Sequence, residues 1–240
     1  ALEKQMLQDL EWIGFEWDEK PYRQSEHFDE YRNAIEKLDQ VSLVYASTMT
    51  RGKIKKFVEE FEASGREWPR DPDGSPLYPG KEQEVENSGS QKIEERLGEA
   101  TIRLDTRKAL AQLDKSLSWQ EFDQGNPSLC TEFVANIAQW GDVVLARRDT
   151  PTSYHLSCVL DDAAQNVTHI VRGSDLMQST AVHRLLQTLF GFYEPVYHHH
   201  GLVLNEDRKK LSKSDKATGL RQLRENGATK AQILEKLGFY

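Results

Sequence analysis

The sequence contains only two cysteines in 240 residues, Cys130 and Cys158, which is too few for a disulfide framework. It has no run of about 18 apolar residues, the length that a membrane-spanning helix requires. Its first 15 residues, ALEKQMLQDLEWIGF, mix charged with apolar side chains, which excludes a signal peptide. We therefore expect a cytoplasmic protein with no membrane partner.

The composition is that of a globular protein, with 38% hydrophobic and 29% charged residues and a formal net charge of −8. Positive charge is nevertheless concentrated in one stretch, DRKKLSKSDK, residues 207–216. Its cationic side chains are Arg208, Lys209, Lys210, Lys213 and Lys216. Two interpretations are open: a solvated surface loop, or a clamp for the phosphates of a nucleotide.

Hydrophobic periodicity predicts a helical first half and an α/β second half. The first half has expected helices at 2–13, 26–38, 50–63, 91–98 and 106–114, the second of them capped by Ser25, and a proline- and glycine-rich insertion at 66–91. The second half has expected strands at 142–148, 153–162, 167–173 and 195–205 and helices at 179–191, 218–226 and 229–237. The short connections between these later elements favour a partly parallel sheet.

Polar side chains lie near the ends of two of these expected strands. Arg172 closes one and Asp175 follows it, while Tyr154 opens another. An arginine fork with a tyrosine hydroxyl can hold an amino acid, but Arg172 can equally pair with Asp162 or Asp175 and bind no ligand. The triple histidine at 198–200 does not predict a metal site, because alternate strand residues face opposite sides and no cysteine or carboxylate has suitable spacing.

Three segments in a fixed order carry a specific resemblance: SYHLSCVLDD, then VTHIVRGSDLMQST, then PVYHHHGLVLNEDRKKLSKSD. Together they resemble the glutamyl-tRNA synthetase group of the class I aminoacyl-tRNA synthetases. KLSKS, residues 210–214, matches the KMSKS signature of that family, with Leu211 in place of the methionine. The upstream segment LQDLEWIGFEWDE also resembles the family, so the likeness covers essentially the whole chain.

The resemblance implies an α/β fold with the Rossmann-like parallel sheet of class I synthetases. The HIGH signature of the family is absent, so the sheet is expected to lack its first strand and HIGH helix. An α+β insertion and a short helical region that contacts the RNA stem are also implied. The expected segments are 1–44 and 142–205 for the two halves of the nucleotide-binding fold, 45–141 for the insertion, and 206–240 for the KMSKS loop and stem-contact helices.

The resemblance also implies the site residues. Tyr154 and Arg172 contact glutamate, Asp175 lies near the adenylate, and Lys210, Ser212 and Lys213 bind the phosphates of ATP, which is expected with Mg²⁺. Only 26 residues follow Ser214, which favours the truncated paralogue group, the glutamyl-Q tRNA(Asp) synthetases. Those enzymes attach glutamate to queuosine in the anticodon loop of tRNA(Asp). The alternatives are a fragment of a glutamyl-tRNA synthetase and a non-catalytic tRNA-binding relic.

Many members of this paralogue group hold zinc in the insertion with three cysteines and a tyrosine. Here Ser47, Met49 and Glu82 stand at the cysteine positions, and only Tyr78 is kept. A set without thiolates is a poor zinc site, so no metal is expected. The insertion is then expected to be held by packing of Tyr45, Ile54, Phe57 and Trp68, in a monomeric protein.

Overall fold

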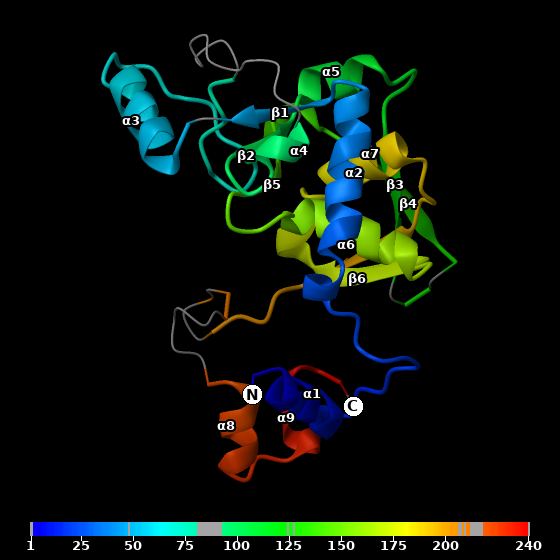
Figure 1. Cartoon of the computed structure of the whole chain (residues 1–240). Coiled ribbons are helices and arrows are strands. Elements are labelled where there is room, and N and C mark those ends of the chain that lie inside the picture. Colours follow the sequence, from blue (N-terminus) through cyan, green and yellow to red (C-terminus); the bar gives the residue numbers. More distant parts are fainter. Residues whose placement is uncertain are drawn as a thin grey trace. The chain divides into compact units, whose positions relative to one another are not determined.

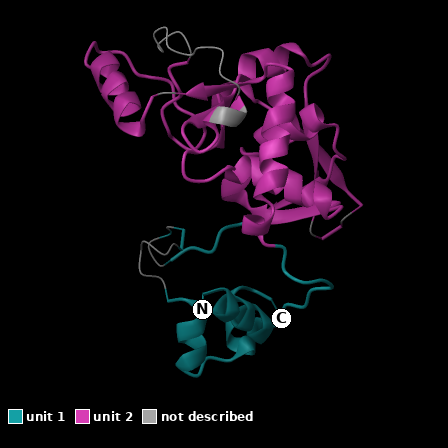
Figure 2. Ribbon diagram, viewed as in Figure 1, with its two compact units in different colours: residues 1–22, 201–240 teal, residues 23–200 magenta. Residues whose placement is uncertain are grey.

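The structure is a computed structural model. It describes residues 2–47, 49–80, 93–123, 125–126, 128–205, 208, 210–211 and 218–239. The chain forms two compact units, one of residues 1–22 with 201–240 and one of residues 23–200 (Figure 2). The four segments expected from the sequence divide the chain by function and not by packing, so these two units do not test them and they stay a prediction.

A four-stranded mixed sheet forms one part of the larger unit, in the strand order β4-β3-β7-β6. Its strands are β3 (Ser118–Phe122), β4 (Cys130–Val134), β6 (His169–Gly173) and β7 (Val196–His200). Strand β7 runs parallel to both β3 and β6, whereas β3 and β4 form an antiparallel hairpin. The partly parallel sheet is therefore confirmed, but the hairpin was not predicted.

A second sheet of three antiparallel strands has the order β1-β2-β5. Its strands are β1 (Val44–Ser47), β2 (Thr101–Leu104) and β5 (Val144–Ala146). The expectation that the strand near 142–148 joins the later strands in one sheet is wrong. The cause is a long-range pairing, because β5 bonds to β2, which lies far earlier in the chain, at Ile102↔Ala146 and Arg103↔Val144.

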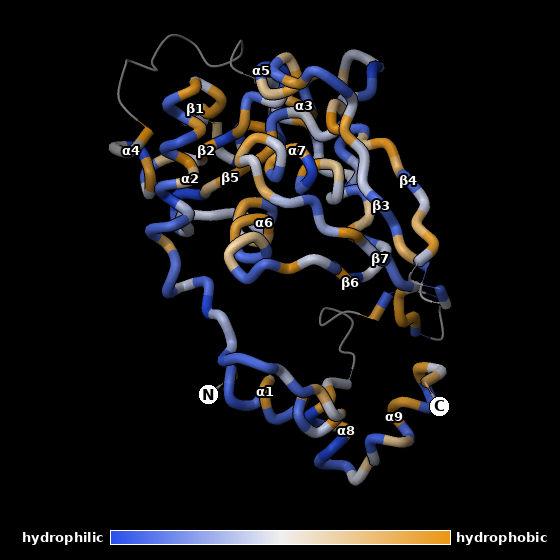
Figure 3. Tube along the Cα trace, turned by 90° about the vertical axis from the view of Figure 1, so that its right-hand side faces the viewer, coloured by the Kyte–Doolittle hydropathy of each residue, from blue (hydrophilic) through white to orange (hydrophobic). Residues whose placement is uncertain are grey.

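Helices join the two sheets into one core (Figure 1). Helix α7 (Thr180–Phe190) packs on β3 and on α6 (Tyr154–Ala164), and α6 in turn packs on β5 and on α2 (Phe28–Gln40). Figure 3 shows hydrophobic colour along α6 and β5. The buried core contains Tyr31, Ile35, Leu38, Ile102, Leu104, Leu145, Leu156, Leu185 and Leu186.

Two details of this core differ from the prediction. The segment 153–162 is not a strand but forms α6, whose N-cap Ser153 accepts from the backbone N–H of Leu156 at 3.4 Å. Its buried positions Leu156 and Val159 follow helical rather than alternating spacing. Ser25 does not cap α2 either, because it lies in the short 3₁₀ helix η1 (Gln24–Glu26), and His27 is the N-cap.

The insertion carries the short helices that were predicted. Helix α3 (Arg51–Glu62) is capped by Thr50, and α4 (Ile93–Arg96) and α5 (Thr106–Ala111) follow. The packing of Trp68 on Phe57, with ring centroids 5.0 Å apart, is confirmed. Phe61 packs on Trp68 as well, with ring centroids 4.9 Å apart.

The smaller unit contains α1 (Leu2–Ile13), α8 (Leu220–Glu225) and α9 (Lys230–Lys236). All three were predicted, and α1 packs against both of the others. An ion pair of 2.9 Å joins Arg224 to Asp9, and Thr229 caps α9 in a capping box with Gln232. Within the described part of the chain, none of the helices combines the length and apolar character needed to cross a bilayer.

Candidate amino-acid binding site

Tyr154 and Arg172, the two residues predicted to contact an amino acid, lie together in the larger unit. Tyr154 is the first residue of α6 and Arg172 lies in β6. Arg172 Nη1 donates to the Tyr154 hydroxyl at 3.5 Å, the long limit for a hydrogen bond. The Tyr154 side chain is half-exposed, so this end of the pair borders solvent.

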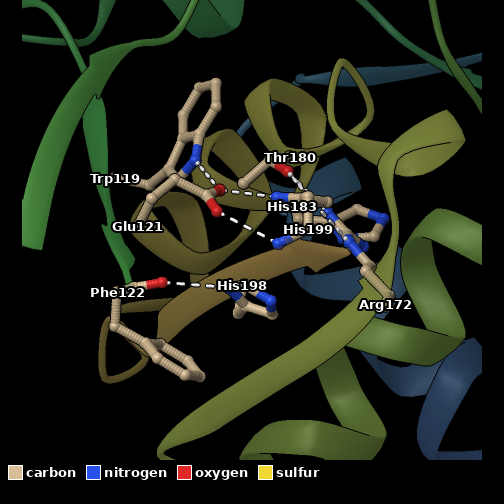
Figure 4. Close-up of polar contacts among 8 residues, drawn as sticks. All are labelled: Trp119, Glu121, Phe122, Arg172, Thr180, His183, His198 and His199. Atoms are coloured by element: carbon tan, nitrogen blue, oxygen red, sulfur yellow. Dashed lines mark hydrogen bonds and ion pairs between the residues drawn. The ribbon is translucent and has the colours of Figure 1, made fainter. Parts of the chain in front are cut away.

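Three further donors of Arg172 bind neutral groups (Figure 4). Nε donates to His199 Nε2 at 3.0 Å, Nη1 to His183 Nδ1 at 3.0 Å, and Nη2 to Thr180 Oγ1 at 2.6 Å. No ion pair joins Arg172 to a carboxylate of the described residues, so the alternative pairing with Asp162 or Asp175 is not found. A guanidinium held by neutral acceptors retains its attraction for an anionic ligand.

The histidines around Arg172 are neutral at physiological pH. Burial, with a smaller contribution from the nearby guanidinium charge, lowers the pKa of His155 to about 4 and holds the pKa of His183 well below its usual range. Burial also lowers the pKa of His199, against the opposing attraction of Glu121. Neutral imidazoles have one lone pair each, which is what an arginine N–H needs as an acceptor.

Glu121 lies at the inner end of this cluster. Its carboxylate accepts from Trp119 Nε1 at 2.7 Å, from the backbone N–H of His199 at 3.1 Å, and from His199 Nδ1 at 2.5 Å. Its side chain is only 13% exposed. Hydrogen bonds therefore link the negative charge of Glu121 to Arg172, with His199 between them.

The buried histidines predict that acid weakens the fold. In the unfolded chain each histidine takes up a proton near pH 6.5, whereas His155 in the folded chain does so only near pH 4, so unfolding binds protons between these values. Each such group lowers the free energy of unfolding by about 1.4 kcal/mol per pH unit as pH falls through that window. Urea unfolding between pH 7.5 and 4.5 measures the slope.

Two carboxyl groups, Asp162 and Asp73, oppose this trend. Burial raises the pKa of Asp162 to about 6, so between that value and its ordinary value the folded chain holds the extra proton and gains stability on acidification. Burial also raises the pKa of Asp73. Three histidines outweigh these two aspartates, so stability is still expected to rise with pH. A flat or inverted profile would contradict the assignment of these histidines as neutral. His155→Asn is expected to reduce the slope by the contribution of one proton, about 1.4 kcal/mol per pH unit.

A cavity of about 420 Å³ lies beside Tyr154 and His155. It is bounded on the other side by the insertion, and its lining includes charged groups of both signs. These charged residues are Arg51, Asp71, Asp73, Arg103, Asp142 and Arg147. Such a volume suits a small molecule or a nucleoside-sized group.

The structure describes two of the other predicted site residues, Asp175 in the larger unit and Lys210 in the smaller one. Asp175 lies in the short helix η4 (Ser174–Leu176), and the pKa of Asp73 is raised by burial and, to a smaller extent, by charges that include Asp175. Lys210 bridges to Leu204 in the smaller unit. Ser212 and Lys213 fall outside the described residues, so the convergence of the lysines with Tyr154 and Arg172 stays a prediction.

A hydrogen bond joins two of the positions at which relatives were expected to hold zinc. Ser47 Oγ donates to the Tyr78 hydroxyl at 2.7 Å, while Glu82 lies outside the described residues. Tyr45 packs near Tyr78 and donates to Asp142 at 2.6 Å. Among the described residues there is no cluster of three potential metal ligands.

Sequence reasoning missed the partners of Arg172, namely Glu121, Thr180, His183 and His199. It weighed the triple histidine only as a metal site. A usable signal was the expected pairing of two parallel strands, since the observed register places His199 directly opposite Arg172. Glu121 gave no signal, because the strand that carries it was not predicted.

Comparison with known proteins gives a consistent picture. Residues 1–239 match the family model described as tRNA synthetases class I (E and Q), catalytic domain. A glutamyl-Q tRNA(Asp) synthetase of Rhodobacter capsulatus is 39% identical over 98% of this chain and 81% of its own length. A glutamate–tRNA ligase of Hydrogenobaculum sp. is 32% identical over 94% of this chain.

Two solved structures that resemble the chain are also glutamate-tRNA synthetases. The enzyme from Elizabethkingia anophelis has a TM-score of 0.65 and 26% identity over 94% of this chain. A glutamate tRNA ligase of Elizabethkingia meningosepticum, solved in complex with its amino acid, has a TM-score of 0.63 and 25% identity. The chain spans under half the length of these ligases, 44% of the Hydrogenobaculum protein and 43% of each solved chain.

Proposed function

Because the chain belongs to the catalytic-domain family of class I tRNA synthetases for glutamate and glutamine, we propose that it activates glutamate with ATP and transfers the glutamyl group to queuosine in tRNA(Asp). The observation that carries the proposal is the fork of Arg172, which has the Tyr154 hydroxyl beside it and neutral acceptors behind it. Such a site attracts a carboxylate.

In the first step, a carboxylate oxygen of glutamate attacks the α-phosphorus of ATP, and the bond to pyrophosphate breaks. The products are glutamyl-adenylate and pyrophosphate. The ammonium groups of Lys210 and Lys213 neutralise the charge that develops on the phosphates, and Mg²⁺ that accompanies ATP would add to this neutralisation. Arg172 and Tyr154 hold the amino acid so that the attacking oxygen is positioned for this displacement.

In the second step, a hydroxyl of the queuosine ring attacks the activated carbonyl and AMP leaves with the electron pair. The preference for this acceptor rests on the 39% identical relative, whose name specifies it. A base in a single-stranded anticodon loop is accessible to a protein pocket, because it can be splayed out of the stack. The protein is expected to act as a monomer in the cytoplasm, where tRNA is charged.

The proposal predicts glutamate-dependent exchange of labelled pyrophosphate into ATP by the full chain. Glutamine and aspartate are the controls. We expect neither to support exchange at more than about a hundredth of the glutamate rate, because glutamine has no side-chain carboxylate and the side chain of aspartate is one methylene group too short. Transfer is then measured with tRNA(Asp) that contains queuosine and with the same tRNA that contains guanosine instead.

Glutamylation that needs queuosine supports the proposed acceptor. Glutamylation of tRNA(Glu) at its 3′ end, independent of queuosine, would instead assign the activity of a glutamate–tRNA ligase. Absence of exchange together with salt-sensitive tRNA binding would identify a binding protein without catalytic activity.

A further inference from the structure

His155 is a polar residue that lies on the wall of a cavity and is not one of the predicted binding residues. It follows Tyr154 in α6 and lines the cavity of about 420 Å³. Its Nδ1 is hydrogen-bonded to His183 Nε2 at 3.2 Å. Its Nε2 makes no hydrogen bond to any residue that the structure describes, so this atom is open to a ligand.

The protonation of the neighbouring histidines can be read from their partners, starting at Glu121. The carboxylate of Glu121 only accepts, so His199 Nδ1 carries the proton that it donates. His199 is neutral, which leaves a lone pair on Nε2. That lone pair accepts from Arg172 Nε–H at 3.0 Å, as the arginine requires.

The same logic continues on the other side of the guanidinium. Arg172 Nη1 can only donate, so His183 Nδ1 is the acceptor and the proton of this neutral ring is on Nε2. His183 Nε2–H then donates to His155 Nδ1. Because His155 is neutral as well, its own proton is on Nε2, the atom that faces no described partner.

A continuous hydrogen-bonded chain therefore runs from Glu121 through His199, Arg172 and His183 to His155. Among the described contacts, two donors of this chain have no partner, namely one Nη2–H of Arg172 and the Nε2–H of His155. His183 is 1% exposed and the His199 side chain is 3% exposed. Water therefore cannot replace the hydrogen-bond partners of these two rings. The positive charge of Arg172 polarises His183 in the direction of His155, which strengthens the Nε2–H of His155 as a donor.

We propose that His155 is a substrate-binding residue that donates its Nε2–H, next to the Tyr154 hydroxyl, to an oxygen of the ligand in this cavity. The proposal rests on the proposed function. The oxygen belongs either to the carboxylate of glutamate or to a hydroxyl of the acceptor nucleoside, because both reactants must meet beside Tyr154. A donor with a fixed proton favours an oxygen acceptor over an ammonium or amide N–H group.

Two variants of the full chain separate binding from support of the fold. His155→Asn places an amide oxygen near the position of Nδ1, where it still accepts from His183, but leaves nothing at Nε2. His155→Gln places its amide near Nε2 and loses the acceptor for His183. We expect His155→Asn to raise the KM of one substrate by about 10-fold to 100-fold, from the loss of one hydrogen bond to the ligand, with an unchanged melting temperature at pH 7.5. His155→Gln is expected to keep KM close to that of the unmodified protein.

The two assays identify the ligand. A raised KM for glutamate in pyrophosphate exchange assigns the oxygen to the amino acid, and a raised KM for tRNA in transfer, with exchange unchanged, assigns it to the acceptor. Either outcome supports the proposal. If His155→Asn leaves both KM values unchanged, or if His155→Gln alone loses activity and stability, His155 only supports the fold and the proposal is overturned.

An independent measurement covers the case in which the unmodified chain shows neither exchange nor transfer, a result that counts against the proposed function alone. Nitrogen-15 NMR of histidine-labelled protein reports the tautomer of each ring. We expect His155 to carry its proton on Nε2, and this resonance to shift on titration with glutamate or with queuosine-containing tRNA(Asp). A proton on Nδ1, or a resonance that neither titration moves, would refute the inference.

Discussion

Replacing Arg172 with lysine is expected to lower kcat/KM for glutamate in pyrophosphate exchange by about 10-fold to 150-fold. A lysine ammonium is a point charge and lacks the fixed fork of donors with which Arg172 binds His199, His183 and Thr180 while it directs its remaining Nη2–H to a carboxylate. A hydrogen bond with a charged group is worth about 1.5–3 kcal/mol, and every 1.4 kcal/mol is a factor of about ten. The rate of exchange as a function of glutamate concentration measures the effect.

The loss is expected mainly in KM for glutamate, because the carboxylate is bound both before and during the attack on ATP. KM for ATP is expected to change little. Arg32→Lys is the matched control, since Arg32 lies on the surface in an ion pair of 2.6 Å with Asp29 and is 45% exposed. An Arg172→Lys protein with normal glutamate dependence would show that the carboxylate binds elsewhere.

Replacing Lys213 with alanine is expected to lower kcat of exchange by about 30-fold to 1,000-fold, which corresponds to about 2–4 kcal/mol in the barrier. In the KMSKS match, Lys213 is the lysine placed between two serines, and its ammonium is proposed to neutralise charge that develops on the phosphates as pyrophosphate leaves. An interaction that strengthens in the transition state affects kcat more than KM.

Lys216→Ala is the control for the second variant, because it removes the same charge from the same basic stretch but lies outside KLSKS. If the stretch acts only as a general basic surface, the two variants will lose the same modest amount of tRNA affinity and neither will lose exchange. That result would restore the interpretation of 207–216 as a solvated loop.

Several parts of the fold could be predicted because they depend on local sequence. The stripe of Tyr31, Ile35 and Leu38 gives α2, and Thr50 gives the start of α3. The segment 153–162 was misread because its apolar residues suit a strand as well as a helix over so short a length. The helix is favoured because Ser153 caps its first turn and Leu156 is buried on one of its faces.

The sequence by itself determined the family, the order of its motifs, and the pairing of Tyr154 with Arg172 as candidates for one site. Only the tertiary structure decided what holds Arg172, because Glu121 and His199 are separated by 78 residues and His199 lies 27 residues from Arg172. Hydrogen bonds across such separations depend on strand register and on the burial of each ring. Neither has a local signature, so the proton positions that leave His155 as a donor follow from packing alone.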